Sequence, residues 1–291
     1  MKVARARWTS ASFLLYAGAL IALGGALAWL GVIASDYGSG AFAGWSALFW
    51  AIAEAVALAL LVKGRRLAAG LAAFVGLGLW AVMVGAFLEW WGWLPDDDAP
   101  IQGFHWGTLL FELLVLVAAI VDLRIWRHPL IVAILVPAAW LFVTDLVSSG
   151  GNWTAVVTLL LGFLFFFVGL GLDGGDSRPY GFWVHVTAGL TIGGALIYWW
   201  HSSDAQWAGI IIVGLIFILV GAGIRRSSYA VLGVIGLVAA TAHYAGDEAV
   251  GSVLSGSPPT KWAVPVAFLC LGVFLALLGM MLYRNRESDA A

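Results

Sequence analysis

A single glutamate inside an apolar segment is the residue of this chain that most directly suggests a chemical function. Glu54 lies about nine residues into the segment from Trp45 to Lys63, which at roughly 1.5 Å per residue places its carboxyl group near the middle of a bilayer. An isolated ionised carboxylate is costly there, so the group must be protonated, paired with a cation or open to an aqueous cavity. Such a group can couple proton exchange to transport, or it can serve as a neutral hydrogen bond between helices.

Two further acids lie on one later apolar segment. Glu112 follows Trp106 by about six residues, hence by roughly 9 Å of helix, in a segment that runs in the same direction as the one bearing Glu54. Glu54 and Glu112 are therefore predicted to line one transport pathway at two depths. Asp122, close to Arg124 at the other end of the segment, is expected to form an interfacial ion pair.

Several more ionisable residues lie at the predicted outer ends of helices. They are Glu89, His105, Asp145, His201 and His243. We expect them to form an outer polar cluster that binds a cation, a metal or a relayed proton. The alternative is that each group caps its own helix in water. No His-x-x-x-His or Glu-x-x-His spacing supports a metal site, so the metal stays unassigned.

The elements that must position these residues are membrane helices. Hydrophobic residues make up 63% of the chain and charged residues only 10%, with 17 tryptophans, a composition that excludes a water-soluble core with a polar skin. The fold class is therefore an all-α polytopic integral membrane protein. The net charge of −2 also excludes a basic surface for nucleic acid.

The apolar runs predict about ten transmembrane spans. They cover residues 12–35, 44–62, 67–93, 106–124, 129–148, 153–172, 182–201, 207–224, 229–245 and 262–283. Basic residues of the connecting segments then gather on the side of the N-terminus: Lys63, Arg65, Arg66, Arg124, Arg127, Arg178, Arg225, Arg226, Arg284 and Arg286. Only Lys261 falls opposite. The positive-inside rule thus predicts that both termini are cytoplasmic and that the protein is multi-pass in the cytoplasmic membrane.

The chain is expected to form a single transmembrane domain over residues 1–291, with a flexible outer loop over 246–261 that is rich in Gly, Ser and Pro. Three segments repeat the same eighteen-position interval: Trp45 to Lys63, Trp106 to Arg124 and Trp207 to Arg225. This interval indicates repeated helical hairpins. Two five-span halves related as inverted repeats are the alternative.

The favoured function is a secondary transporter or permeation protein, proton-coupled through Glu54. The second hypothesis is a non-catalytic membrane scaffold or sensor subunit. The third is an intramembrane metal-dependent enzyme that uses His105, His201 and His243. The chain lacks the hydrolase, zinc-protease, P-loop and dinucleotide motifs, so catalysis is not favoured and no cofactor is expected. The predicted partners are the lipid bilayer and a small cation or metabolite; the sequence does not identify a protein partner.

Overall fold

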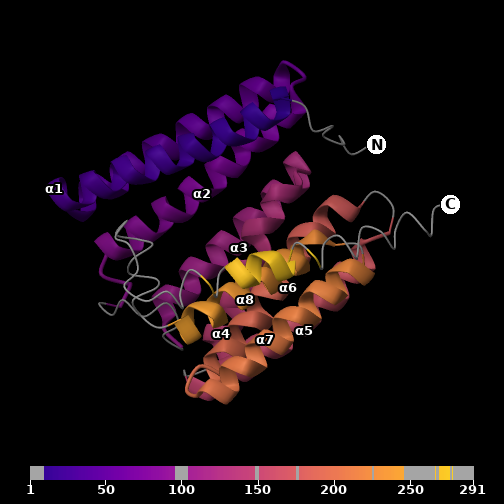
Figure 1. Ribbon diagram of the computed structural model, residues 1–291. Helices are drawn as coiled ribbons and strands as arrows, with labels where there is room; N and C mark the ends of the chain where they lie inside the picture. The colour runs from indigo at the N-terminus through magenta and orange to yellow at the C-terminus, as the bar shows by residue number, and fades with distance from the viewer. Residues whose placement is uncertain are drawn as a thin grey trace. The chain divides into compact units, whose positions relative to one another are not determined.

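The computed structural model describes residues 10–95, 104–147, 151–174, 177–224, 226–245, 266, 269–275 and 277. Within these ranges every regular element is helical (Figure 1). The elements are α1 (Ser10–Val62), α2 (Arg66–Trp90), α3 (Trp106–Trp126), the 3-10 turn η1 (Pro129–Ile131), α4 (Val132–Val147), α5 (Gly151–Leu172), α6 (Arg178–Trp199), α7 (Asp204–Gly223) and α8 (Ser227–Ala245).

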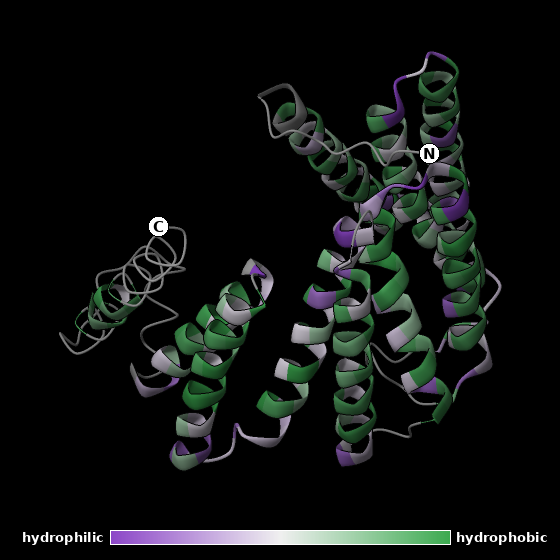
Figure 2. Ribbon diagram, turned by 90° about the vertical axis from the view of Figure 1, so that its right-hand side faces the viewer, coloured by the Kyte–Doolittle hydropathy of each residue, from purple (hydrophilic) through white to green (hydrophobic). Residues whose placement is uncertain are grey.

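Six of these helical segments are long and apolar enough to cross a membrane. They are Leu14–Val62, Arg66–Trp90, Pro129–Val147, Gly151–Leu172, Arg178–Trp199 and Asp204–Gly223. Hydrophobic residues cover most of the helical ribbon (Figure 2), and many large apolar side chains, such as Ile21 and Phe167, are exposed. Outward-facing apolar side chains suit a lipid solvent. The all-α class is thereby confirmed for the described residues, and at least six helices are long and apolar enough for a multi-pass membrane protein.

Helix α1 consists of two arms that fold back on each other. Gly38 interrupts the helical backbone with φ 79° and ψ 175°, a conformation that glycine adopts easily. The ring centroids of Trp29 and Trp45 lie 6.3 Å apart, and those of Trp29 and Phe49 lie 5.7 Å apart. A straight helix would separate residues sixteen positions apart by roughly 24 Å. The predicted spans 12–35 and 44–62 are therefore the arms of a hairpin, and the loop expected between them is replaced by a sharp break.

The second arm of α1 packs along α2 in antiparallel register. The rings of Trp50 and Trp80 lie 5.1 Å apart, and the carboxyl group of Glu54 lies against Gly76. In both pairs the two residue numbers add up to the same total. This is expected when two antiparallel helices lie side by side in fixed register. Small residues at a helix contact allow this approach, and a Cβ atom at Gly76 would overlap Oε1 of Glu54.

Helices α2 and α3 and the turn η1 enclose one part of the interior of the first unit. Leu77, Ala119 and Ile131 form one buried cluster with at most 1% of each side chain exposed. The ring of Phe111 in α3 lies over Gly85 of α2. A Cβ atom at Gly85 would lie 3.5 Å from this ring. The residue numbers also add up to one total in the pairs Leu77–Ala119 and Gly85–Phe111. Helices α2 and α3 are therefore antiparallel and in fixed register.

By its internal contacts the chain divides into two compact units, Met1–Thr187 and Ala188–Ala291. The expectation of a single domain over 1–291 stays a prediction. The predicted loop 246–261 lies outside the described residues, and so does most of the predicted span 262–283. Its described part, residues 269–275, is helical and includes the exposed Cys270.

In the second unit α7 and α8 approach closely through glycines. A Cβ atom at Gly214 would come within 2.9 Å of the carbonyl oxygen of Gly233, and a Cβ atom at Gly233 would meet the backbone of Gly214 and the side chain of Ile218. Backbones in contact leave no room for a methyl group on either helix. Gly236, one turn further along α8, has its nearest neighbouring atoms at 3.9 Å.

Gly233→Ala is expected to destabilise the α7–α8 pair by roughly 1–3 kcal/mol, since an added methyl group forces the backbones apart. Gly236→Ala is the matched control: its methyl group makes an ordinary contact and its helix propensity improves by up to about 1 kcal/mol. Thermal unfolding in detergent measures both. Equal midpoints for the two variants would contradict the close approach.

Candidate functional site: buried carboxyl groups of the first unit

The main polar feature of the first unit is a pair of carboxyl groups between α3 and α4. Glu112 of α3 is 4% exposed and Asp145 of α4 is fully buried. Their carboxyl groups are neighbours, close enough for the charge of one to act on the other. Two adjacent carboxylates cannot both ionise in such a site. The pair is therefore a proton-holding site.

The Glu112 carboxyl group has spare hydrogen-bonding capacity. Among the described residues, Oε2 of Glu112 is buried and has no hydrogen-bond partner. Thr144, next to Asp145, is also fully buried, and its hydroxyl has no partner within the same part of the chain. Buried polar atoms in folded proteins are nearly always satisfied by protein, water or ligand. This site can accordingly bind a small polar molecule.

The two members of the pair were expected in different groups, Glu112 on the transport pathway and Asp145 in the outer polar cluster. The structure brings them together. The hypothesis that Asp145 caps its helix in water is wrong for this residue, because its side chain is enclosed by the bundle.

Glu54 occupies a second acidic location, at the contact between α1 and α2. Its carboxyl group lies against Gly76, and the charged group that acts on it is Asp122 of α3. Trp126, one turn along α3, is a neighbour of Asp122. Asp122 was expected to pair with Arg124 at the interface. The charge of Asp122 also acts on Glu54, so α3 carries one acid of each location, and the ion pair stays a prediction.

The remaining first-unit members of the predicted outer cluster are separate features. Glu89 is exposed at the end of α2. His105 precedes α3 and, with Trp93, Trp106, Gly107 and Leu110, lines an open and mostly apolar pocket. Its Nδ1 is buried and finds no partner in the described ranges.

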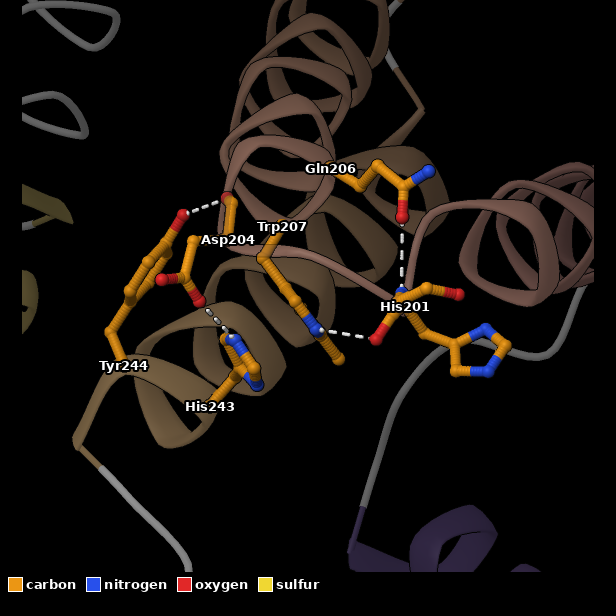
Figure 3. A network of polar contacts seen from close by, with 7 residues as sticks. His201, Asp204, Gln206, Trp207, His243 and Tyr244 are labelled. Atoms are coloured by element: carbon orange, nitrogen blue, oxygen red, sulfur yellow. Dashed lines mark hydrogen bonds and ion pairs between the residues drawn. The ribbon is translucent and has the colours of Figure 1, made fainter.

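The two second-unit histidines lie near the turn between α6 and α7 (Figure 3). Nε2 of His243 lies 3.1 Å from Oδ1 of Asp204, and the His243 ring stacks on Trp207 with centroids 4.5 Å apart. The Tyr244 hydroxyl donates to the carbonyl of Asp204. These contacts hold the end of α8 to the start of α7.

His201 belongs to the same turn but has another role. Its carbonyl accepts from Nε1 of Trp207 at 3.1 Å, while its Nδ1 lies 2.7 Å from the Tyr198 carbonyl. Its imidazole points away from His243 (Figure 3). His201 thus caps its own helix, as the alternative hypothesis expected. No group of three His, Cys, Asp or Glu side chains suited to a metal occurs among the described residues.

Two buried histidines of the first unit complete the polar interior. His185 of α6 is fully buried, with Nε2 3.1 Å from Oδ2 of Asp173, and it rests in the space left by Gly169. His128 is 6% exposed and lies against Gly70, with Nδ1 accepting from the Leu130 N–H. The Asp173 partner of His185 and the Gly70 neighbour of His128 come from other segments, which is why residue spacing alone did not reveal these contacts.

No known protein family, curated protein or solved structure matches this chain.

His128 predicts a pH dependence of stability. Burial lowers its pKa to about 4, from about 6.5 in an unfolded chain. The unfolded state therefore binds the proton more tightly, and stability is lost as the pH falls from about 6.5 towards about 4. At pH 5 we expect the loss to be on the order of 1–2 kcal/mol relative to pH 7.5.

The variant His128→Asn keeps a local acceptor without a titrating ring, so its unfolding midpoint should fall less between pH 7.5 and pH 5 than that of the natural chain. The exposed His201 gives the control, because His201→Asn should keep the full pH dependence. An unchanged slope in His128→Asn would show that another group is responsible.

Proposed function

We propose that this chain is a proton-coupled secondary transporter or permeation protein of the cytoplasmic membrane. In this proposal the Glu112–Asp145 pair is the principal proton-binding site and Glu54 is a second acid on the pathway. The observation that carries the proposal is the contact between two carboxyl groups at 4% and 0% exposure in a membrane bundle. Ionisable groups buried in membrane helices are costly, and they commonly mark ion and proton pathways.

The chemistry follows from the shared proton. With one proton the pair carries a single negative charge, which can attract a small cation or a protonated amine. A monovalent cation that takes the place of the proton leaves the charge of the site unchanged, because one positive charge enters as the other leaves. Exchange at the pair would thereby couple the movement of a cationic substrate to a proton gradient.

The proposed topology is ten spans with both termini in the cytoplasm. Its support is the one-sided distribution of basic residues in the connecting segments, as in the loops that contain Lys63 and Arg178. The hairpin form of α1 supplies the first two spans of this count.

Proteoliposomes that carry the purified protein test the function through dissipation of an imposed pH gradient in the presence of cations, amines and metabolites. We expect Glu112→Gln and Asp145→Asn each to lower substrate-dependent proton flux at least about 100-fold, the scale of a lost proton-transfer group. Glu54→Gln should also lower it. The control is Glu89→Gln, which changes an exposed carboxylate and should leave the flux unchanged.

Flux that is equal in the natural chain and in Glu112→Gln would exclude the pair as the proton site. No flux from a folded natural chain across the panel would reject the transporter proposal and favour the scaffold or sensor hypothesis, in which the carboxyl pair is an interhelical contact.

The topology is tested with single cysteines in a Cys270→Ala background and a membrane-impermeant maleimide. Cysteines at Lys63 and Ser177 should be labelled from one side of the membrane, and cysteines at Leu94 and Ser202 from the other. Spheroplasts and inverted vesicles should give opposite patterns. Labelling of Lys63→Cys and Ser177→Cys from opposite sides would mean an odd number of crossings between them and would overturn the ten-span arrangement.

A further inference from the structure

A tyrosine fastens the start of α6 to the end of α3. The ring of Tyr180 packs against a buried cluster that contains Val136 and Val184. Its hydroxyl group donates to the carbonyl oxygen of Arg127 at 2.7 Å, and the charge of Arg127 acts on the same hydroxyl group. The residue that follows α3 therefore lies beside the first turn of α6, although 53 positions of the chain separate the two partners.

Two exposed arginines from different segments lie at this contact. One is Arg127 itself, and the other is Arg178, which begins α6 two residues before Tyr180, hence about 3 Å away along the helix axis. The N–H groups of the first turn of α6 add a partial positive charge at the same place. A guanidinium group has five N–H donors, so a contact within the protein leaves others for a ligand. The contact thus offers the charge and the donors that suit a phosphate group.

Arg127 also has an unusual backbone conformation. Its φ of 52° and ψ of 37° are those of the left-handed helix, and among the described residues it is the one non-glycine residue with a positive φ. Glycine, or sometimes asparagine, usually ends a helix in this way. Other residues held in this conformation cluster at functional sites. The chain keeps an arginine where glycine is more favourable, which indicates that the guanidinium group is used.

The surrounding end of the first unit is basic. A Cβ atom at Gly70 would lie 2.6 Å from the ring of His128, which places the start of α2 at the same end as the turn after α3. The exposed basic residues described at this end are Lys63, Arg65, Arg66, Arg124, Arg127 and Arg178. The acids described there are Asp122 and Asp173, both partly buried, and Oδ2 of Asp173 lies 3.1 Å from Nε2 of His185. The charges of this end together favour an anion.

The depth of this end in a bilayer indicates which anion binds. Arg178 is the first residue of a segment that is long and apolar enough to cross a membrane, so it lies at the level of the lipid head groups. Anionic phospholipids carry their phosphate groups at this level. Basic sites between membrane helices bind such head groups, and arginine matches a phosphate group with paired hydrogen bonds.

We propose that Arg127 and Arg178, placed together by Tyr180, bind the phosphate group of an anionic phospholipid. The two arginines supply the charged donors, and Tyr180 is a positioning residue that fixes the Arg127 backbone. The bound lipid stabilises the contact between the end of α3 and the start of α6. This inference does not depend on the transport proposal.

Lipid-dependent stability of the intact protein in detergent tests the site. With phosphatidylglycerol at about 100 times its Kd, we expect the unfolding midpoint to lie about 5 °C above the midpoint with the same amount of phosphatidylcholine. Inorganic phosphate at that concentration should give no such shift. Equal midpoints in the two lipids, or an equal shift with inorganic phosphate, would overturn the lipid site.

Arg127→Gly is the most informative variant, because glycine suits the left-handed backbone and only the guanidinium side chain is lost. Its midpoint in phosphatidylcholine should stay close to that of the natural chain, while most of the shift with phosphatidylglycerol should disappear. Arg178→Gln should reduce the shift as well. The matched control is Lys63→Gln, which removes one positive charge from the same end of the unit and should keep the shift.

Native mass spectrometry gives a second readout, since the natural chain should retain phosphatidylglycerol under conditions in which Arg127→Gly has lost it. A full shift in both arginine variants would overturn the site. An equal loss in Lys63→Gln and Arg127→Gly would mean diffuse attraction to a basic surface and would overturn it too. Loss of the shift and of the retained lipid in the arginine variants alone supports the site. Each variant is compared between lipids, so a general loss of stability cannot imitate this result.

Discussion

The constraint that governs this structure is the lack of water in the bilayer core. Every buried polar group must there find its partner within the protein, and an unpaired carboxylate is far costlier than in water. Glu112 of α3 and Asp145 of α4 meet this constraint as neighbours whose charges act on each other. The same contact allows the charge of the site to change, because a pair that holds one proton can gain or lose a proton with little rearrangement of the structure.

Glycines on neighbouring helices provide the room for several of these polar side chains. Gly70 faces His128, Gly76 faces the Glu54 carboxyl group, and Gly169 faces the His185 ring. At each of these glycines a Cβ atom would overlap the polar side chain. Glycine in membrane helices is usually explained by close backbone packing, as between α7 and α8. In the first unit it also makes pockets for ionisable groups.

Helix α3 organises the interior because it faces both acidic locations. Glu112 lies towards its beginning and Asp122 towards its end, with Val115 and Ala119 buried between them.

The sequence by itself determined the membrane class, the approximate helical segments and the identity of Glu54 and Glu112 as ionisable residues at membrane depth. Those features follow from composition and from distance along one helix. The partnership of Glu112 with Asp145, the link from Asp122 to Glu54 and the turn at Gly38 came only from the tertiary structure. Helices that are apolar on nearly all sides carry no amphipathic stripe from which their rotation could be predicted. Rotation and register decide which side chains meet, and packing between helices alone sets them.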